Sequence, residues 1–164
     1  KAFVSTAKQH DIDFSILSAV NSANENRPVN IAHKIIETKN LKKGNTVAIL
    51  GLSFKPNTND VRDSTSLKIA KVLIEKNIKI KSYDPEAMQD AKAVTKELIL
   101  CKSPYEACES VDVIIIATEW NEFRALNFKK IKEKVNDLVI FDLRNIYNST
   151  ELKEIGFEYY GIGT

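Results

Sequence analysis

The sequence predicts a doubly wound α/β fold, in which a mostly parallel sheet of about six strands is covered by helices on both faces. The first observation is that short β-branched runs alternate with amphipathic stretches from residue 41 onward. The second is that the run VIIIA (113–117) is apolar throughout, which is typical of a strand buried on both faces. The third is that the strand-like TVAIL is followed by a loop and then by the helix-like SLKIAKVLIEK. This alternation indicates a Rossmann-like domain.

Six segments are expected to be strands, and the segments 46–50 and 111–118 are expected to form the central pair. Amphipathic segments such as 66–76 and 123–135 lie between strands and are expected to be covering helices. In such a sheet the carboxyl ends of the strands meet at one edge, where ligands bind beside the point at which strand order reverses. The expected strands are TVAIL (46–50), IKIKSY (78–83), ELILC (97–101), VDVIIIAT (111–118), LVIFDL (138–143) and FEYYGI (157–162).

The first 40 residues are expected to form helices. A short helix is predicted near the start, followed by a turn at HDID and by a second helix with apolar residues at helical spacing. Pro28 is expected to kink or interrupt this second helix, because proline lacks an amide hydrogen and clashes with the preceding turn. We expect the apolar positions to pack on a surface other than the domain that follows, and a second copy of the chain is one possibility. They are Phe3, Val4 and Ala7 in the first helix, Phe14, Leu17, Val20 and Ala23 in the second, and Ile31, Ile35 and Ile36 after Pro28.

Composition excludes some classes of function. At 164 residues the chain can bury a full core, and we expect one domain with an appendage. The 24 lysines and arginines nearly balance the 22 aspartates and glutamates, and a net charge of +2 is too small to indicate a nucleic-acid-binding surface. No apolar stretch approaches the roughly 20 residues that span a bilayer. We therefore expect a soluble, cytoplasmic protein with neither a nucleic-acid nor a membrane partner.

The cysteines and histidines do not predict a metal site. Cys101 and Cys108 lack CxxC spacing and are expected to be buried thiols in a reducing compartment. His10 and His33 lie far apart in the sequence without a nearby set of ligands, so we expect ordinary packing or surface roles for both.

The loop GLSFKPNTNDVRDSTS (51–66) lies between a predicted strand and a predicted helix, where α/β proteins usually hold nucleotides. The dinucleotide fingerprint GxGxxG needs glycines so that the backbone can approach a pyrophosphate. Ser53 and Pro56 stand where two of those glycines would be. Asp63 or Ser64 is placed to cap the following helix. A conventional NAD site on this loop is therefore not expected.

The same loop offers side chains that suit an anionic ligand. Lys55 supplies a point charge for phosphate, Arg62 a rigid fork for bidentate contact, and Phe54 an apolar plate. One interpretation is an anion site built from side chains. The alternative is that Lys55 and Arg62 merely pair with Asp60 and Asp63 on the surface.

Two further residues follow predicted strands at the ligand edge. Arg144 comes directly after LVIFDL, which leads to the hypothesis that Arg144 and Lys55 face one cleft. The alternative for Arg144 is a surface ion pair. Asp84, in SYDP, stands where a dinucleotide fold has its ribose-binding acid, but without the glycines we favour an Asp-Pro turn.

Three separated motifs resemble the UDP-glucose/GDP-mannose dehydrogenase family. The stretch VAILGLSFKPNTNDVRDSTSLKIAKVLIEKNIKIKSYDP resembles the opening of the family's C-terminal, UDP-binding domain. Two further motifs are similar to sequences of the branch that acts on UDP-glucose. They are ATEWNEFR (117–124), and DLRNIY (142–147) followed by GFEYYGIG (156–163). The resemblance implies that Phe54 and Lys55 contact the UDP-sugar, that Arg144 contacts the substrate, and that Arg62 reaches the NAD cofactor.

The resemblance also implies a domain organisation. KAFVSTAKQHDIDFSILSAVNSANEN is similar to the family's central dimerising helices, so residues 1–40 are expected to be part of that helical domain and to support a homodimer. Residues 41–164 are then expected to be the UDP-binding, Rossmann-like domain.

The family oxidises the C6 alcohol of the sugar twice to a carboxylate and reduces two NAD⁺. Its catalytic cysteine lies in a segment resembling GGxCxPKDTKA, and Lys1 and Ala2 resemble the last two residues of that segment. We therefore expect the nucleophile and the glycine-rich NAD loop to lie upstream, and this chain alone to be inactive. Neither Cys101 nor Cys108 matches the nucleophile, so no catalytic residue is assigned within the chain.

Two alternatives remain open. The shared loop also fits oxidation of UDP-N-acetyl sugars or GDP-mannose by a member of the same family. A rival from another class is a non-catalytic assembly module, in which the α/β domain docks on helices of a partner subunit and holds no ligand.

Overall fold

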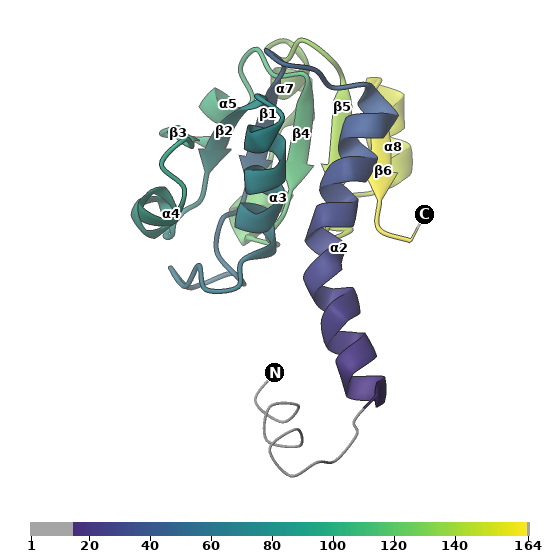
Figure 1. The fold of residues 1–164 in the computed structure, drawn as a ribbon. Helices are drawn as coiled ribbons and strands as arrows, with labels where there is room; N and C mark the ends of the chain where they lie inside the picture. Colours follow the sequence, from purple (N-terminus) through teal and green to yellow (C-terminus); the bar gives the residue numbers. More distant parts are fainter. Residues whose placement is uncertain (1–14, 164) are drawn as a thin grey trace.

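A six-stranded sheet forms the centre of the protein (Figure 1), in a computed structural model that describes residues 15–163. All strand pairings are parallel, and the strand order is β3-β2-β1-β4-β5-β6. The predicted fold class and the central pair of β1 and β4 are confirmed. Each of the six predicted strands is present, although the outer strand β3 has only two residues. The strands are β1 Thr46–Leu50, β2 Lys79–Tyr83, β3 Ile99–Leu100, β4 Val113–Ile116, β5 Val139–Asp142 and β6 Glu158–Gly161.

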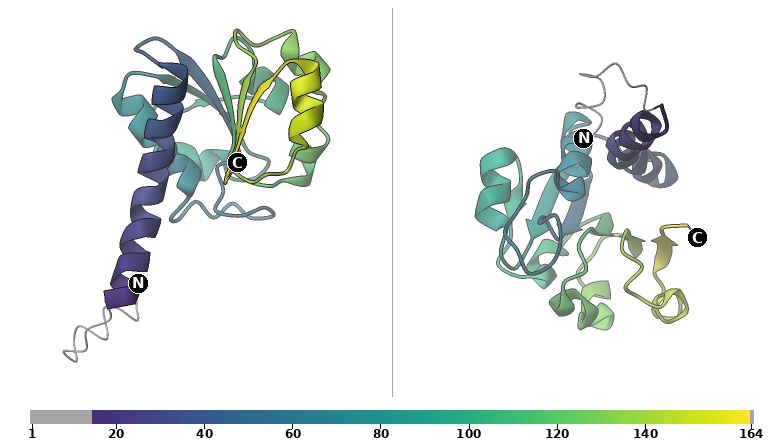
Figure 2. Two further views of the ribbon diagram at one scale, coloured as in Figure 1. Left: turned by 90° about the vertical axis from the view of Figure 1, so that its right-hand side faces the viewer. Right: turned by 90° about the horizontal axis from the view of Figure 1, so that it is seen from below.

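Helices cover both faces of the sheet. α2, α3 and α4 contribute to the core on one face, and α5, α6, α7 and α8 contribute to the core on the other. Figure 2 shows α2 on one side of the sheet and the yellow helix α8 on the other. The four residues of β4 are all buried, as expected for a strand covered on both faces. The helices are α2 Ser15–Lys39, α3 Thr65–Glu75, α4 Met88–Val94, α5 Pro104–Ala107, α6 Asn121–Arg124, α7 Phe128–Lys132 and α8 Ser149–Ile155.

The predicted helix after the loop 51–64 is confirmed as α3. Its N-cap is Ser64, whose hydroxyl oxygen accepts the N–H of Leu67 at 3.4 Å. Leu67, Ala70 and Leu73, at helical spacing, are buried against the sheet. The segment 123–135, in contrast, does not form one helix. It is divided between α6 and α7, because Asn127 caps the second helix by accepting the N–H groups of residues 129 and 130.

The predicted interruption at Pro28 is wrong, because α2 runs unbroken through this residue. A proline inside a helix removes one backbone hydrogen bond and crowds the preceding turn. Here Pro28 is itself buried, and Ala32 and Ile35, one and two turns further along, are fully buried in the core. Burial of this face stabilises the helix enough to offset the lost bond.

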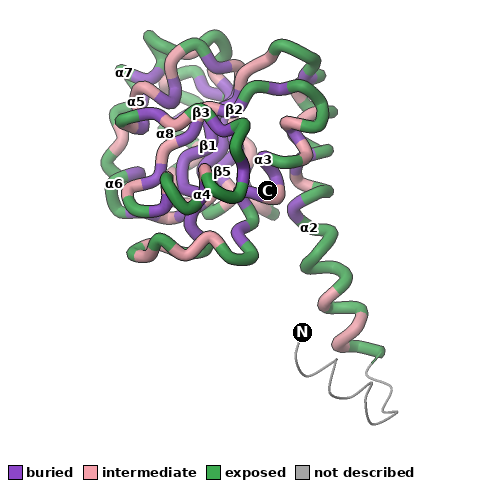
Figure 3. Tube along the Cα trace, turned by 60° about the vertical axis from the view of Figure 1, so that its left-hand side comes forward, coloured by how far each residue is buried: buried purple, intermediate pink, exposed green. Residues whose placement is uncertain are grey.

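The expectation that the apolar positions after Pro28 pack outside the α/β domain is also wrong. Ile35 lies in the core beside α3, and Ile31 and Ile36 pack against the same cluster. The N-terminal half of α2 extends beyond the body of the protein and is largely exposed (Figure 3), including Ile16 and Val20. The predicted first helix, with Phe3, Val4 and Ala7, lies outside the described residues, as does Phe14. The division of the chain at residue 40 stays a prediction.

Cys101 and Cys108 are buried free thiols, as predicted. Burial raises the pKa of both, that of Cys108 to about 12, so neither is a reactive thiolate. His33 is exposed on α2, whereas His10 lies outside the described residues. Within residues 15–163, no cluster of three or more His, Cys, Asp or Glu side chains is arranged to hold a metal ion. Over the same residues, no helix is both long and apolar enough to cross a membrane.

Candidate functional site

The turn after β1 brings the chain very close to the end of β4. Gly51 has φ of +95°, and a Cβ added there would lie 2.6 Å from the Cβ of Thr118. The Thr118 hydroxyl donates to the carbonyl oxygen of Ser53 at 2.9 Å, so the two strand ends are also joined by a hydrogen bond. Only glycine combines this positive φ with this close approach. The strand order of the sheet reverses between β1 and β4, so this turn lies at the point where ligands usually bind in such sheets.

The loop 52–64 is closed by its own hydrogen bonds. The N–H of Phe54 donates to the carbonyl oxygen of Asp60 at 2.8 Å, which joins the two sides of the loop. At the loop's end, the hydroxyls of Ser64 and Ser66 donate to the carbonyl oxygen of Leu52 at 2.7 and 3.2 Å. These hydrogen bonds give the loop a defined conformation, in which Phe54 is 57% exposed.

Asp84, at the end of β2, is fully buried behind this turn. One of its carboxylate oxygens, Oδ2, accepts the N–H of Leu52 at 2.7 Å, and the N–H and hydroxyl of Ser53 at 3.0 Å each. The same oxygen accepts the indole N–H of Trp120 at 3.2 Å. The other oxygen accepts two amides of the following turn, those of Glu86 at 2.9 Å and Ala87 at 2.8 Å. The favoured Asp-Pro turn is thus present, but the carboxylate also organises two further loops.

Asp84 is held as an anion although it is buried. Burial alone would raise the pKa of this carboxyl, but hydrogen bonds from the backbone amides of Ser53, Glu86, Leu52 and Ala87 outweigh that effect and lower the pKa below its ordinary value.

The β1 turn does not fit a dinucleotide in the usual way. In a dinucleotide-binding sheet, the amides of this turn face the pyrophosphate and the acid after the second strand binds a ribose hydroxyl. Here the amides of Leu52 and Ser53 are already bound to Asp84, and Asp84 has no exposed surface. The residues at this turn therefore do not fit NAD, in agreement with the missing glycines.

A second buried carboxylate organises the loop that carries Arg144. Asp142, at the end of β5, is fully buried, and its Oδ1 accepts the N–H of Arg144 at 3.0 Å. Its Oδ2 accepts the N–H groups of Ile146 and Tyr147 at 2.8 and 3.1 Å, and the hydroxyl of Tyr159 at 3.0 Å. The backbone next to Arg144 is therefore fixed by an adjacent strand end.

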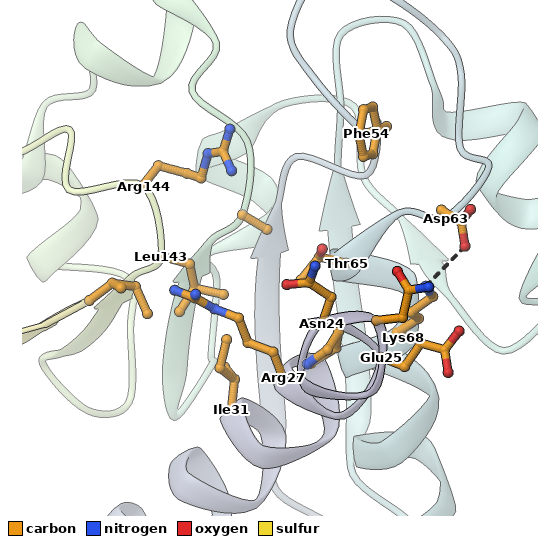
Figure 4. A pocket seen from close by; sticks show the side chains of 14 residues that line it. Asn24, Glu25, Arg27, Ile31, Phe54, Asp63, Thr65, Lys68, Leu143 and Arg144 are labelled. Atoms are coloured by element: carbon orange, nitrogen blue, oxygen red, sulfur yellow. Dashed lines mark hydrogen bonds and ion pairs between the residues drawn. The ribbon is translucent and has the colours of Figure 1, made fainter. Parts of the chain in front are cut away.

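These loops and α2 enclose a pocket of about 540 Å³ at the carboxyl edge of the sheet (Figure 4). Phe54 and Arg144 lie on its sheet side, and Asn24 and Arg27 reach it from α2. The pocket thus brings together Phe54 and Arg144, two of the four residues to which the resemblance assigns ligand contacts, although they come from opposite ends of the domain. Its lining residues are Asn21, Asn24, Glu25, Arg27, Pro28, Ile31, Phe54, Asp63, Thr65, Lys68, Ala117, Leu143, Arg144 and Ile162.

Arg144 both lines this pocket and forms the ion pair considered as its alternative role. Its Nε donates to a carboxylate oxygen of Glu119, and the two side chains are 38% and 30% exposed. The hydrogen bond from Arg144 outweighs partial burial and lowers the pKa of Glu119 below its ordinary value. The guanidinium is therefore held in place at the wall of the pocket.

Lys55 and Arg62 lie outside this pocket. Lys55 is exposed and, within the described part of the chain, forms no hydrogen bond or ion pair, so the structure does not bring it to one cleft with Arg144. Arg62 forms a bidentate pair with Asp60, with Nε to Oδ1 at 3.0 Å and Nη2 to Oδ2 at 2.8 Å. The hydrogen bonds from Arg62 lower the pKa of Asp60 to about 2. The surface pair considered as an alternative is therefore present for Arg62, whose side chain is 89% exposed.

Sequence reasoning missed the contribution of α2 to the pocket. Asn21, Asn24, Pro28 and Ile31 recur at intervals of three and four, so they share one face of a helix. This spacing could have been recognised in the sequence, but the expected interruption of the helix at Pro28 kept residues 21–24 and 28–31 from being assigned to one helix face. Glu119 was also missed, although it lies in the quoted motif ATEWNEFR.

Comparison with known proteins places these features in a family. Residues 48–149 match the model of the UDP-glucose/GDP-mannose dehydrogenase family, UDP binding domain. The chain is 42% identical over 160 residues to the UDP-glucose 6-dehydrogenase of Rickettsia conorii, covering 96% of this chain and 37% of that protein. It is 38% identical over 163 residues to the enzyme of the same name from Rhizobium meliloti, covering 99% of this chain and 37% of that protein.

Solved structures agree with this match. A UDP-glucose dehydrogenase from Pyrobaculum islandicum superposes with a TM-score of 0.81 at 28% identity, over 98% of this chain and 35% of that one. A UDP-D-ManNAc dehydrogenase from Pyrococcus horikoshii superposes with a TM-score of 0.76 at 28% identity, over the same shares of the two chains. The chain thus spans a little over a third of the length of the dehydrogenases it matches. By sequence and by fold, the chain belongs to the UDP-glucose/GDP-mannose dehydrogenase family, and its residues 48–149 match that family's UDP binding domain.

Proposed function

We propose that this chain is the C-terminal, UDP-sugar-binding part of an NAD-dependent UDP-glucose 6-dehydrogenase. Such an enzyme converts UDP-glucose, water and two NAD⁺ to UDP-glucuronate and two NADH. The observation that carries the proposal is that Phe54 and Arg144, which match the family's substrate contacts, line one pocket at the carboxyl edge of the sheet. The names of the relatives support UDP-glucose as the substrate.

The side chains at this edge suit a nucleotide sugar. Phe54 presents an exposed aromatic face that a flat or apolar part of the ligand would cover. Arg144 provides a fixed fork for an anionic or hydroxyl-bearing group, because Glu119 and the backbone near Asp142 hold it in place. Lys55 is next to Phe54 in the loop, and its long, exposed side chain is able to turn toward a phosphate.

The remaining assignments belong to the same proposal. NAD is bound mainly by an upstream domain, and Arg62 reaches toward that cofactor. The catalytic cysteine also lies upstream, in the segment whose last two residues Lys1 and Ala2 resemble. No catalytic residue is assigned here, and the chain alone is inactive in UDP-glucose-dependent NADH production. The protein is cytoplasmic and forms a homodimer through its N-terminal helices, for which the exposed Ile16 and Val20 of α2 offer apolar surface.

Titration with UDP tests the site. Lys55→Ala and Arg144→Ala should each weaken UDP binding by tens of fold, because losing a charged partner to the ligand costs on the order of 2 kcal/mol. Lys129→Ala and Lys153→Ala, at exposed positions on α7 and α8, are the controls and should bind UDP normally. Unchanged UDP affinity in both site variants of a folded, intact protein would contradict the assignment.

Arg62→Ala distinguishes the cofactor role from the substrate role. In the intact protein it should weaken NAD binding more than UDP binding, as measured by separate titrations. The reverse order would count against the transfer of this role from the family.

A second candidate is oxidation of another nucleotide sugar by the same arrangement. The similarity to the UDP-D-ManNAc dehydrogenase of Pyrococcus horikoshii, at the same 28% identity as the UDP-glucose enzyme above, favours testing it. Turnover of UDP-glucose, UDP-N-acetyl sugars and GDP-mannose by the intact protein separates the candidates. Absence of UDP binding would instead favour a non-catalytic assembly module.

A further inference from the structure

The β1 turn has the donor arrangement of an anion site, but the anion is part of the protein. Three donors of this turn, the amides of Leu52 and Ser53 and the Ser53 hydroxyl, converge on Oδ2 of Asp84 within 2.7 to 3.0 Å. Successive backbone amides pointing at one centre are how such turns hold the phosphates of a nucleotide. The carboxylate from the neighbouring strand β2 takes that place here.

The same oxygen joins this turn to the end of β4. The indole N–H of Trp120 donates to Oδ2 at 3.2 Å, and Trp120 is only 7% exposed. Glu119, the residue before Trp120, holds the guanidinium of Arg144. One buried atom of Asp84 therefore links the loop of Phe54 to the loop that supports Arg144.

Phe54 has little packing of its own to hold it. Phe54 is 57% exposed, so its position depends on the backbone that carries it. Ser53, the residue before it, is bound to Asp84, and the Phe54 amide itself donates to the carbonyl oxygen of Asp60 at 2.8 Å. If the attachment to Asp84 is lost, the backbone before Phe54 and Lys55 keeps only the bond from the Thr118 hydroxyl to the Ser53 carbonyl oxygen and is held less firmly.

We infer that Asp84 is a positioning residue for the UDP-sugar site, acting as a built-in anionic ligand that holds the loop of Phe54 and Lys55 in its binding conformation. The inference rests on the proposed function, since it assigns a role to Asp84 in that same site. It also gives a physical reason why this turn does not fit a dinucleotide. Asp84, the acid that would contact a ribose in a dinucleotide fold, points inward. It accepts the amides of Leu52 and Ser53, which would otherwise contact a pyrophosphate.

A purely structural role for Asp84 is the competing explanation, and the chain offers a matched control. Asp112 lies at the opposite, amino edge of the sheet and also ties loops together. Its oxygens accept the N–H of Thr46 at 2.8 Å and the side-chain amides of Asn45 at 2.8 Å and Asn136 at 3.0 Å. Both are hydrogen-bonded carboxylates, but Asp112 is only partly buried, accepts fewer hydrogen bonds and organises the other edge of the sheet.

The experiment compares Asp84→Asn with Asp112→Asn in the intact protein. Each variant keeps the shape of the side chain but turns an NH₂ group toward N–H donors, so both should unfold at lower denaturant concentration. Only Asp84→Asn should weaken UDP binding, measured by calorimetric titration well below the unfolding transition, by about tenfold or more. Asp112→Asn should bind UDP within about twofold of the wild type.

Trp120 supplies a spectroscopic readout, because it is the only tryptophan among the 164 residues. The difference in emission between the wild type and Asp84→Asn should report an indole whose hydrogen-bond acceptor is no longer a charged carboxylate, whereas Asp112→Asn should leave the emission unchanged. If Asp84→Asn does not fold, Ser53→Ala replaces it. This variant removes one donor to Oδ2 and should weaken UDP binding by about threefold, with a smaller change in emission.

Normal UDP affinity in folded Asp84→Asn, or in Ser53→Ala when that variant is the one tested, would overturn the inference and leave the proposed function standing. An equal loss of affinity in Asp112→Asn would also overturn it, since the effect would then follow stability alone. If the wild type itself does not bind UDP, the proposed function fails and the role of Asp84 fails with it.

Discussion

At the carboxyl edge of the sheet, the fully buried Asp84 accepts six hydrogen bonds from three loops, whereas at the amino edge the partly buried Asp112 accepts three. Both carboxylates tie neighbouring loops, but only the carboxyl edge also carries a pocket with Phe54 and Arg144 on its wall. The edge expected to hold the ligand is therefore the more densely hydrogen-bonded of the two, and the buried carboxylates of Asp84 and Asp142 accept those bonds.

The glycines of the two edges also differ, because only the one at the carboxyl edge is crowded by its surroundings. Gly51, at the carboxyl edge, and Gly44, at the amino edge, have similar φ values of +95° and +98°. An added Cβ would lie 2.6 Å from the Cβ of Thr118 at Gly51, but would meet nothing within 4 Å at Gly44. The φ angles are therefore nearly equal, but only Gly51 is crowded by a neighbour.

The largest expected effect is that of Gly51→Ala. It should lower the free energy of unfolding by about 3 kcal/mol or more, because steric overlap with Thr118 adds to the strain of a positive φ. Gly44→Ala carries the φ strain alone and should cost about 1 kcal/mol. Urea denaturation of both variants measures the difference. Equal losses would mean that the two edges are not packed differently at these turns.

A smaller effect is expected from Asp142→Asn, which alters the second buried carboxylate of the carboxyl edge. Its loss of charge should cost about 2 kcal/mol of stability, because three backbone amides and the Tyr159 hydroxyl depend on it. UDP binding should weaken by about tenfold as the backbone at Arg144 loosens.

Tyr159→Phe is the control for that prediction. It removes one donor to Asp142 and leaves the carboxylate and the amide of Arg144 in place, so about 1 kcal/mol of stability should be lost with UDP affinity unchanged. If this variant weakened UDP binding as much as Asp142→Asn, a direct link between Asp142 and Arg144 would be ruled out. Denaturation and calorimetric titration supply both measurements.

The smallest effect on stability is expected from Glu119→Gln, which removes the carboxylate paired with Arg144. The pair is partly exposed, so at most about 1 kcal/mol should be lost. Because the folded pKa of Glu119 lies below its ordinary value, the stabilisation is present above the ordinary pKa and is lost as pH falls through the lowered one. The difference from the wild type should therefore shrink below about pH 4.

The amino edge again supplies the control. Glu109 and Lys134 form an ion pair of 2.5 Å between exposed side chains, and the hydrogen bond from Lys134 lowers the pKa of Glu109. Glu109→Gln should show the same direction of pH dependence in denaturation experiments, but no change in UDP affinity. Glu119→Gln should change UDP affinity measurably, and identical UDP titrations for the two variants would argue against a role for Glu119 at the site.

Much of the fold was predictable from periodicity. Each of the six strands was located from its short β-branched run, and β4 was placed at the centre because it is apolar on both faces. The long helix α2 was only partly predictable. A local rule for Pro28 predicted a kink or an interruption, whereas burial of Ala32 and Ile35 against the domain keeps the helix unbroken.

The site was predictable in its residue types and less so in its geometry. Sequence reasoning selected Phe54 and Arg144, and the topology brings both to one pocket. It also placed Lys55 and Arg144 in one cleft, which the loop geometry does not support. It missed Arg27, because the sequence of a helix does not tell which part of the protein its faces contact. The roles of Phe54, Lys55, Arg62 and Arg144 in binding stay predictions.

The sequence by itself determined the alternation of strands and helices, the missing glycines of the β1 turn and the resemblance of its motifs to a dehydrogenase family. These are local properties, since they depend on residue type and spacing within short segments. Only the tertiary structure decided that Asp84 would face inward and occupy the amides of Leu52 and Ser53. That outcome depends on the distance between two strand ends and on complete burial, because a carboxylate excluded from water must take its hydrogen bonds from whatever donors the fold brings near.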